Sequence, residues 1–202
     1  MTFWRGDAPL ILASRSHARK MLLANAGLDF EAIPADIDER ELQEASKLSS
    51  PRDIALLLAC AKAKVVSAFN AGRYVVGADQ TLALGDRILS KPVDQAAAMS
   101  QLQDLAGRTH ELHSAVAVAQ DGKVLFQEVN VARMTMRPLT EAQLAVYLDA
   151  AGNTVTSSVG AYQLERFGIH LFDSIDGTHF TILGLPLLPL LAFLRREQLL
   201  TI

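Results

Sequence analysis

The first residues suited to chemistry lie in the stretch LILASRSHARK, residues 10–20. A short apolar run with the character of a strand is followed by Ser14, Arg15, Ser16, Arg19 and Lys20, and then by a helical pattern. Backbone N–H groups at a helix start point outward, and Arg or Lys side chains add charge-assisted hydrogen bonds. The stretch therefore predicts a phosphate site, although a solvated helix start with ordinary surface cations is an alternative.

A carboxylate follows a second apolar run, in the sequence YVVGADQ at residues 74–80. The run predicts a buried strand that ends at Asp79, and open α/β sheets bind ligands where strands end. A carboxylate there can hold a divalent cation or orient a water molecule. Lys91, in the sequence LSKP after a turn at residues 85–86, can bring a positive charge to the same place. The alternatives are a carboxylate that caps a turn and a solvated loop lysine.

Three acidic residues, Asp36, Asp38 and Glu39, lie within four positions and can supply hard oxygen ligands for Mg²⁺ or Mn²⁺. An acidic surface loop is the alternative. The five histidines lack the HExxH spacing of a zinc site, so we interpret them as structural or solvated. The single cysteine, Cys60, lies in a helical pattern, which excludes a disulfide within the chain and favours packing.

Other function classes are disfavoured by missing motifs and by charge. The chain has no GxxxxGK[ST] loop, no GxGxxG fingerprint and no GxSxG elbow. A formal net charge of -3 argues against nonspecific binding to nucleic acid or to a membrane surface. No leader pattern precedes the first strand, and the apolar run at residues 182–194 carries two prolines and is too short to span a membrane. We expect a cytoplasmic protein in which that run forms a buried helix.

Strands and helices alternate along the 202 residues, which predicts one α/β domain over 1–202 with a mixed sheet. Ser50-Pro51 predicts the start of a helix that reaches residue 69, with Lys62 on its otherwise apolar face. The hairpin signal Asp121-Gly122 separates two long strands, and Thr140 to Gln143 predicts a capping box. The remaining predicted elements are a strand at 10–13, helices at 21–26, 94–105 and 140–148, and a glycine-rich, serine-rich loop at 152–160 that is either functional or flexible.

Six stretches in register resemble the Maf family of nucleoside triphosphate pyrophosphatases: LILASRSHARK, VVGADQ, LSKP, LAGRTHE, VGAYQLERFG and ILGLPL. The resemblance implies a curved mixed sheet flanked by helices, of the Maf and ITPase type, with a cleft between two lobes. It also implies metal-dependent hydrolysis of a nucleotide to the monophosphate and pyrophosphate, with Mg²⁺ or Mn²⁺ as cofactor. The residues implied to be catalytic are Asp79, Lys62, Lys91 and Arg19; Ser14 is implied to bind substrate, and Asp79 with Glu39 to hold the metal.

Two positions match the branch of this family that resembles 7-methyl-GTP pyrophosphatase: Gln80 and Glu165, where the dTTP/UTP branch has threonine and glutamine. A carboxylate such as Glu165 suits the positive charge of a 7-methylguanine ring. Ala18 departs from the family pattern, because His17-Ala18 replaces a proline and a bulky residue. A dTTP or UTP pyrophosphatase and a nucleotide-binding regulator of cell division are the alternatives. The resemblance further implies a homodimer, and the charge and the short apolar run predict no stable nucleic-acid partner and no membrane association.

Overall fold

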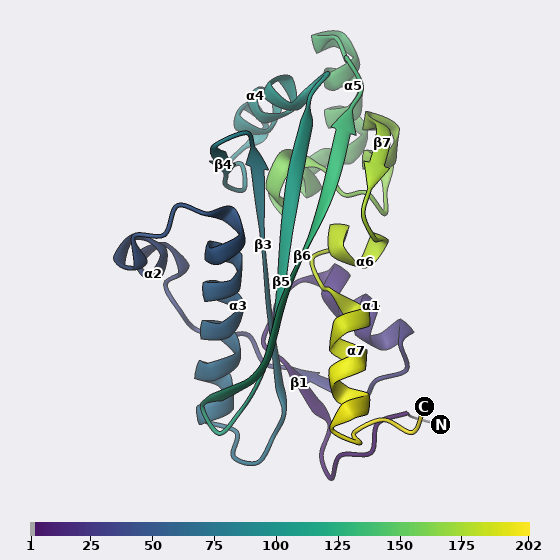
Figure 1. Cartoon of the computed structure of the whole chain (residues 1–202). Helices are drawn as coiled ribbons and strands as arrows, with labels where there is room; N and C mark the ends of the chain where they lie inside the picture. The colour runs from purple at the N-terminus through teal and green to yellow at the C-terminus, as the bar shows by residue number, and fades with distance from the viewer. Residues whose placement is uncertain (1–2) are drawn as a thin grey trace. The chain divides into compact units, whose positions relative to one another are not determined.

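The computed structural model describes residues 3–202, and within them the strands form one mixed, seven-stranded sheet (Figure 1). The strand order is β2-β1-β3-β5-β6-β7, with β4 paired to β3. β1 runs parallel to β2 and β3, whereas β4 and β7 are antiparallel to their partners. The predicted mixed α/β architecture is confirmed. The strands are β1 (Leu10–Leu12), β2 (Phe30–Ala32), β3 (Val75–Leu84), β4 (Arg87–Leu89), β5 (Thr109–Gln120), β6 (Lys123–Met136) and β7 (Phe172–Asp176).

The chain divides into two compact units. The first unit contains residues up to 80 together with 114–130 and 183–202, and the second contains residues 81–113 and 131–182. Strands β3, β5 and β6 contribute residues to both units. A single domain over 1–202 and a cleft between two lobes stay predictions.

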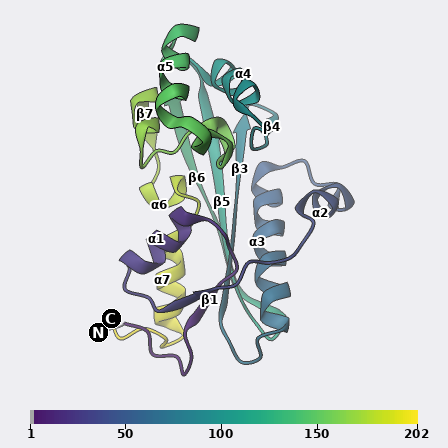
Figure 2. The same ribbon diagram turned by 180° about the vertical axis from the view of Figure 1, so that it is seen from behind.

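In the first unit, α3 (Pro51–Ala68) covers one face of the strands, and α1 (His17–Asn25) and α7 (Leu187–Arg196) cover the other (Figures 1 and 2). Small side chains form the α3 contact: Ala55, Ala59 and Ala63 pack with Ala115, Ala117, Ala119 and Val129. On the opposite face, the ring of Phe126 stacks on that of Phe193. The short helix α2 (Glu39–Ser46) contacts α3.

Helix α3 forms as the sequence predicts. The Ser50 side chain accepts a hydrogen bond from the Asp53 N–H and caps the helix, and Pro51 occupies its first turn, where no N–H is needed. Lys62 is buried with the apolar residues of this helix, as predicted. The helix therefore carries a positive charge toward the sheet.

Gly77 lets β3 and α3 approach closely. A Cβ atom at this position would collide with the backbone of Ala59 and Ala63, so only glycine fits. Because alternate side chains of a strand point to the same face, Asp79 faces α3 as Gly77 does, and Gln80 points to the other face. The close approach sets the distance between Lys62 and Asp79.

The second unit has a hydrophobic core that contains side chains such as Leu102, Leu105, Met134 and Leu144. The Thr140 and Gln143 capping box is present at the start of α5, as predicted. The helical elements are α4 (Gln95–Leu105), α5 (Glu141–Ala151), α6 (His179–Ile182) and the 3-10 helices η1 (Gly152–Thr156), η2 (Val159–Ala161) and η3 (Phe167–Leu171). The tight hairpin at Asp121 and Gly122, which lies in the first unit, is also confirmed, with positive φ at both residues.

Three predictions about elements are wrong. β3 continues to Leu84, so Asp79 lies inside the strand, because the chain goes on pairing with β4 after leaving β1. Residues 152–160 are not a plain loop, since η1 and η2 form there and Val155 and Gly160 are buried. The apolar run at 182–194 is not one helix, because Gly184 with positive φ and Pro186 separate α6 from α7.

Within residues 3–202, none of the helices has both the length and the hydropathy needed to cross a membrane.

Candidate active site

Lys62 bridges two carboxylates in the first unit. Its Nζ lies 2.6 Å from Asp79 Oδ1 and 2.8 Å from Glu39 Oε1. The side chains of Lys62 and Asp79 are 11% and 10% exposed, whereas that of Glu39 is 52% exposed. The bridge joins helix α3, strand β3 and the first residue of helix α2, so three separate segments meet at one ammonium group.

Arg19 adds a second cation and is held by backbone carbonyls. Its Nε donates to Gly184 O at 2.7 Å, and its Nη1 donates to Ala78 O at 2.8 Å and to Ser14 Oγ at 3.4 Å. In the part of the chain that the structure describes, Nη2 makes no protein hydrogen bond. The guanidinium is thus fixed by three groups, and its Nη2 can donate hydrogen bonds to an anion.

The turn between β1 and α1 places the groups around Arg19. Ser14 Oγ accepts from the Ser16 N–H at 3.2 Å, and Ser16 Oγ caps α1 by accepting from the Arg19 N–H at 3.4 Å. The N–H groups of His17 and Ala18, at the start of this helix, remain available for an anion. The anion site predicted from LILASRSHARK stays a prediction. Ala18 is partly buried in the first turn, and Arg15 is exposed.

The charges of this cluster balance, because Asp79 and Glu39 face Lys62 and Arg19. Burial raises the pKa of the Asp79 carboxyl, while the nearby Lys62 and Arg19 charges oppose that rise. Burial also lowers the pKa of the Arg19 guanidinium, and the charges of Asp79 and Glu39 oppose that change. A guanidinium stays protonated in proteins. The cluster is therefore close to neutral, and a polyanion needs further positive charge to bind there.

Gln80 is held from the other face of β3. Its Nε2 donates to the buried Ser114 Oγ at 2.8 Å, which fixes the direction of the amide. Asp79 and Gln80 are neighbours in sequence but project to opposite sides of the strand. Gln80 thus stands beside the cluster and does not belong to its ion pairs.

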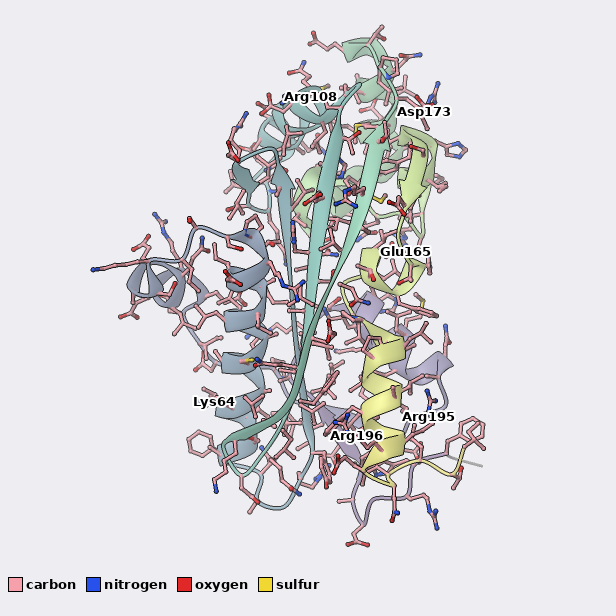
Figure 3. All side chains as sticks on the ribbon, viewed as in Figure 1. Lys64, Arg108, Glu165, Asp173, Arg195 and Arg196 are labelled. Atoms are coloured by element: carbon pink, nitrogen blue, oxygen red, sulfur yellow. The ribbon has the colours of Figure 1, made fainter. Side chains whose placement is uncertain are left out.

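Two predicted site residues belong to the second unit. Lys91 is exposed in the segment between β4 and α4, and Glu165 is exposed in the turn before η3 (Figure 3). The structure brings together Ser14, Arg19, Lys62, Asp79 and Glu39 in the first unit, whereas a part for Lys91 and Glu165 in the same site stays a prediction.

The donor set suits a divalent cation only with help from a substrate. Asp79 Oδ2 and Glu39 Oε2 make no hydrogen bond or ion pair with any residue in the range 3–202, so each carboxylate keeps one oxygen for a ligand. No group of three His, Cys, Asp or Glu side chains within that range is placed to hold a metal ion. Mg²⁺ is commonly bound through one or two carboxylates plus substrate phosphates and water. The residues fit such a cation.

The other chemistry-bearing residues have structural roles. Asp38 caps α2 by accepting from the Glu41 N–H, and Asp36 is exposed, so of the three acidic residues only Glu39 joins the cluster. Cys60 is only partly buried; it packs against the alanine contact of α3 and donates to Gln127 Oε1. His110 is buried and hydrogen-bonded to Tyr162 OH at 2.7 Å, which agrees with a structural histidine.

The model of a family described as "Maf-like protein" matches residues 9–197. The chain belongs to the Maf-like family. It is 70% identical, over the whole of both chains, to a protein of Bradyrhizobium diazoefficiens named nucleoside triphosphate pyrophosphatase. It is 53% identical to a protein of Brucella abortus named 7-methyl-GTP pyrophosphatase, covering 94% of this chain and 96% of that one. A solved structure of a HAM1 protein from Coxiella burnetii is more distant, with 18% identity, a TM-score of 0.41, and coverage of 64% of this chain and 73% of that one.

Two residues of the Maf-like site were not singled out from the sequence. Gly184 lies in the stretch ILGLPL, but its contact with Arg19 spans 165 positions, so only the motif itself signals a function. Its φ of 85° favours glycine, and a Cβ there would lie 3.2 Å from Arg19 Nη2. Ser114 stands in a long apolar strand, and no pattern in the sequence ties it to Gln80.

Proposed function

We propose that this chain hydrolyses the α–β phosphoanhydride of a nucleoside triphosphate, most favourably 7-methyl-GTP, and releases the monophosphate and pyrophosphate. The observation that carries the proposal is the buried Asp79 carboxylate held between Lys62 and Arg19. The Bradyrhizobium relative is named nucleoside triphosphate pyrophosphatase, and its similarity runs along the whole chain. The Brucella relative supports the choice of 7-methyl-GTP.

In the proposed mechanism Asp79 accepts the proton of the attacking water. A general base works best when its pKa approaches the working pH, and burial raises the pKa of Asp79 in that direction. Its second oxygen, Oδ2, is not engaged by Lys62 and can take the proton. Removing a proton makes the water a stronger nucleophile toward the α-phosphorus.

Cationic groups hold the phosphates during this attack. Arg19 offers Nη2, and the helix start after Ser14 offers N–H groups, so both stabilise charge that develops on phosphate oxygens. Lys62 can turn its ammonium from the carboxylates toward a phosphate, since its stem is flexible. In this proposal Lys91 neutralises the leaving pyrophosphate.

A divalent cation, Mg²⁺ or Mn²⁺, completes the proposed site. Asp79 and Glu39 would hold it, and when bound it supplies positive charge that polarises the phosphoryl oxygens. The need for such charge follows from the balance of the cluster, because two carboxylates already offset Lys62 and Arg19.

Base recognition is assigned to Gln80, Glu165 and the space left by Ala18. The Glu165 carboxylate can accept from the N1–H and the exocyclic amine of guanine and is attracted to a methylated, cationic ring. A preference for dTTP or UTP is the alternative within the same chemistry. A nucleotide-binding regulator of cell division is less well supported, because a pure binding protein does not need a buried carboxylate beside two cations.

The test is pyrophosphate release from 7-methyl-GTP, GTP, dTTP, UTP and CTP with Mg²⁺ or Mn²⁺. The proposal predicts the highest kcat/KM for 7-methyl-GTP and no turnover when a chelator removes the metal. A preference for dTTP or UTP would overturn the assignment of Gln80 and Glu165. Binding of nucleotides without turnover of any would favour the regulator.

The resemblance to the Maf-like family also supports a homodimer in the cytoplasm. Light scattering of the purified protein measures its mass directly, and a mass of one chain at micromolar concentration would contradict the dimer. Fluorescence of a carboxyl-terminal fusion in cells tests the location.

A further inference from the structure

The ion pairs of Lys62 suggest which group neutralises the carboxylates of the proposed cation site when no nucleotide is bound. We propose that Lys62 is the counter-ion of Asp79 and Glu39 in the nucleotide-free protein, so that these carboxylates bind a divalent cation tightly only together with a nucleotide. This inference rests on the proposed function, because the metal site it concerns is the one proposed above.

The first argument is geometric. Lys62 Nζ contacts one oxygen of each carboxylate, at 2.6 Å and 2.8 Å, so the ammonium stands between the two groups that would hold the metal. The side chain is almost fully buried, and water screens its charge poorly. A divalent cation that approaches the same carboxylates meets the repulsion of Lys62 as well as their attraction.

The second argument is the number of ligands. Two carboxylates are the acidic side chains that the cluster offers, and no third His, Cys, Asp or Glu within residues 3–202 is placed to join them. Mg²⁺ requires about six oxygen ligands and exchanges its waters reluctantly. Phosphate oxygens of a nucleotide would supply ligands that the protein lacks.

The third argument concerns what the nucleotide offers to Lys62. A triphosphate brings anionic oxygens that an ammonium on a four-carbon stem can reach by rotation. Lys62 can then leave the carboxylates without losing a partner, and the carboxylates become free for the cation. Each ligand therefore favours the other, and such coupling is reciprocal by thermodynamic necessity.

The experiment measures binding of Mn²⁺ alone to the full chain, by electron paramagnetic resonance of the free ion, without any nucleotide. The variant Lys62→Met removes the ammonium and keeps the length of the side chain, and Lys62→Gln is the second variant in case the first is poorly folded. The control is Lys64→Met, which removes the same charge from an exposed position on the same helix (Figure 3).

We expect both Lys62 variants to bind Mn²⁺ at least tenfold more tightly than the wild type, and Lys64→Met to bind it as the wild type does. An α,β-methylene triphosphate cannot be cleaved at that bond. In the wild type with this analogue bound, the affinity for Mn²⁺ should be at least tenfold higher than the affinity of the analogue alone for the ion. Equal Mn²⁺ affinity of the wild type and both Lys62 variants would overturn the inference, as would an absence of coupling to the analogue.

Failure of this inference is distinct from failure of the proposed function. If the wild type hydrolyses nucleotides but the Lys62 substitutions leave Mn²⁺ binding unchanged, only the counter-ion role is contradicted. A wild type that turns over none of the nucleotides contradicts the proposed function, whatever the Mn²⁺ measurements give.

Discussion

The two units bury polar side chains of different kinds. In the first unit some of the buried groups are charged: Lys62 and Asp79 form an ion pair, and Arg19 lies beside them. In the second unit His110 and Tyr162 form a neutral pair at 2.7 Å, surrounded by the apolar core. Burial lowers the pKa of His110 to about 4 and raises the pKa of the Tyr162 hydroxyl, so both are uncharged at pH 7.

The difference agrees with the proposed function, in which the charged cluster takes part in chemistry and the neutral pair does not. Desolvation of an ion pair costs about as much as its attraction returns, so a buried pair is weak support for stability. A neutral hydrogen-bonded pair avoids the cost of desolvating two charges, and it satisfies the two atoms that it joins, His110 Nε2 and the Tyr162 hydroxyl. The first unit thus contains a charged cluster that adds little stability, and in the proposed function this cluster binds an anionic ligand. The second unit has a neutral hydrogen bond in its core.

The largest expected effect on stability comes from His110. Its pKa is about 6.5 in an unfolded chain and about 4 in the folded protein, so between these pH values the unfolded state binds more protons. Stability is therefore fully present above pH 6.5 and decreases as pH falls toward 4, by about 3 kcal/mol in total. Urea unfolding at a series of pH values measures this loss.

The double variant His110→Phe with Tyr162→Phe removes the titrating ring and leaves no unpaired hydroxyl. It should lose this part of the pH dependence, while Tyr162→Phe alone should keep it. If the double variant and the wild type show the same slope between pH 6.5 and 4, the interpretation of His110 is wrong.

The next largest effect is expected on kcat/KM, when the contact that holds Arg19 is disturbed at Gly184. Gly184→Ala places a methyl group 3.2 Å from Arg19 Nη2 and strains a backbone with positive φ, so the guanidinium must shift from its carbonyl partners. A lost hydrogen bond to a charged group costs about 2 kcal/mol, which corresponds to about a 30-fold decrease in kcat/KM.

The control for this variant is Gly72→Ala. Gly72 also has positive φ, but a Cβ there meets nothing within 4 Å, so the substitution reproduces the backbone strain alone. Equal activities of the two alanine variants would show that the contact with Arg19 does not matter.

The smallest effect is expected at Gln80, which points away from the ion pairs. Gln80→Thr gives up the hydrogen bond to Ser114 and introduces the residue of the dTTP/UTP branch. We expect the ratio of kcat/KM for 7-methyl-GTP over dTTP to fall about fivefold, with kcat for the preferred substrate largely kept, since one hydrogen bond is worth about 1 kcal/mol. A uniform fall in kcat for both nucleotides would place Gln80 in catalysis instead of selectivity.

Local features of this fold could be predicted because their causes are local. The caps at Ser50 and Thr140, the hairpin at Asp121 and Gly122, and the buried position of Lys62 all follow from neighbouring residues. The turn from the first strand into a helix was also predictable, because the strand, the serines and the helix start lie within eleven positions. Binding of an anion at this turn stays a prediction.

The features that could not be predicted depend on contacts between segments that are distant in the sequence. The polar residues Asp79 and Gln80 suggest that β3 ends, yet the strand continues. Lys62 pairs with Asp79 on one face of the strand, and Ser114 accepts a hydrogen bond from Gln80 on the other. The carbonyl of Gly184 holds Arg19 from the other end of the chain, and the break between α6 and α7 is part of that contact. Sequence spacing carries no information on such pairings.

The most direct test of the charged cluster is one set of measurements on Asp79→Asn. This substitution keeps the size of the side chain and removes the proton acceptor. We predict that hydrolysis of the preferred triphosphate falls about 10³-fold, as for loss of a general base, while binding of a non-hydrolysable triphosphate remains measurable. Hydrolysis within tenfold of the wild type would contradict the assignment of Asp79 and with it the chemical role of the buried charges.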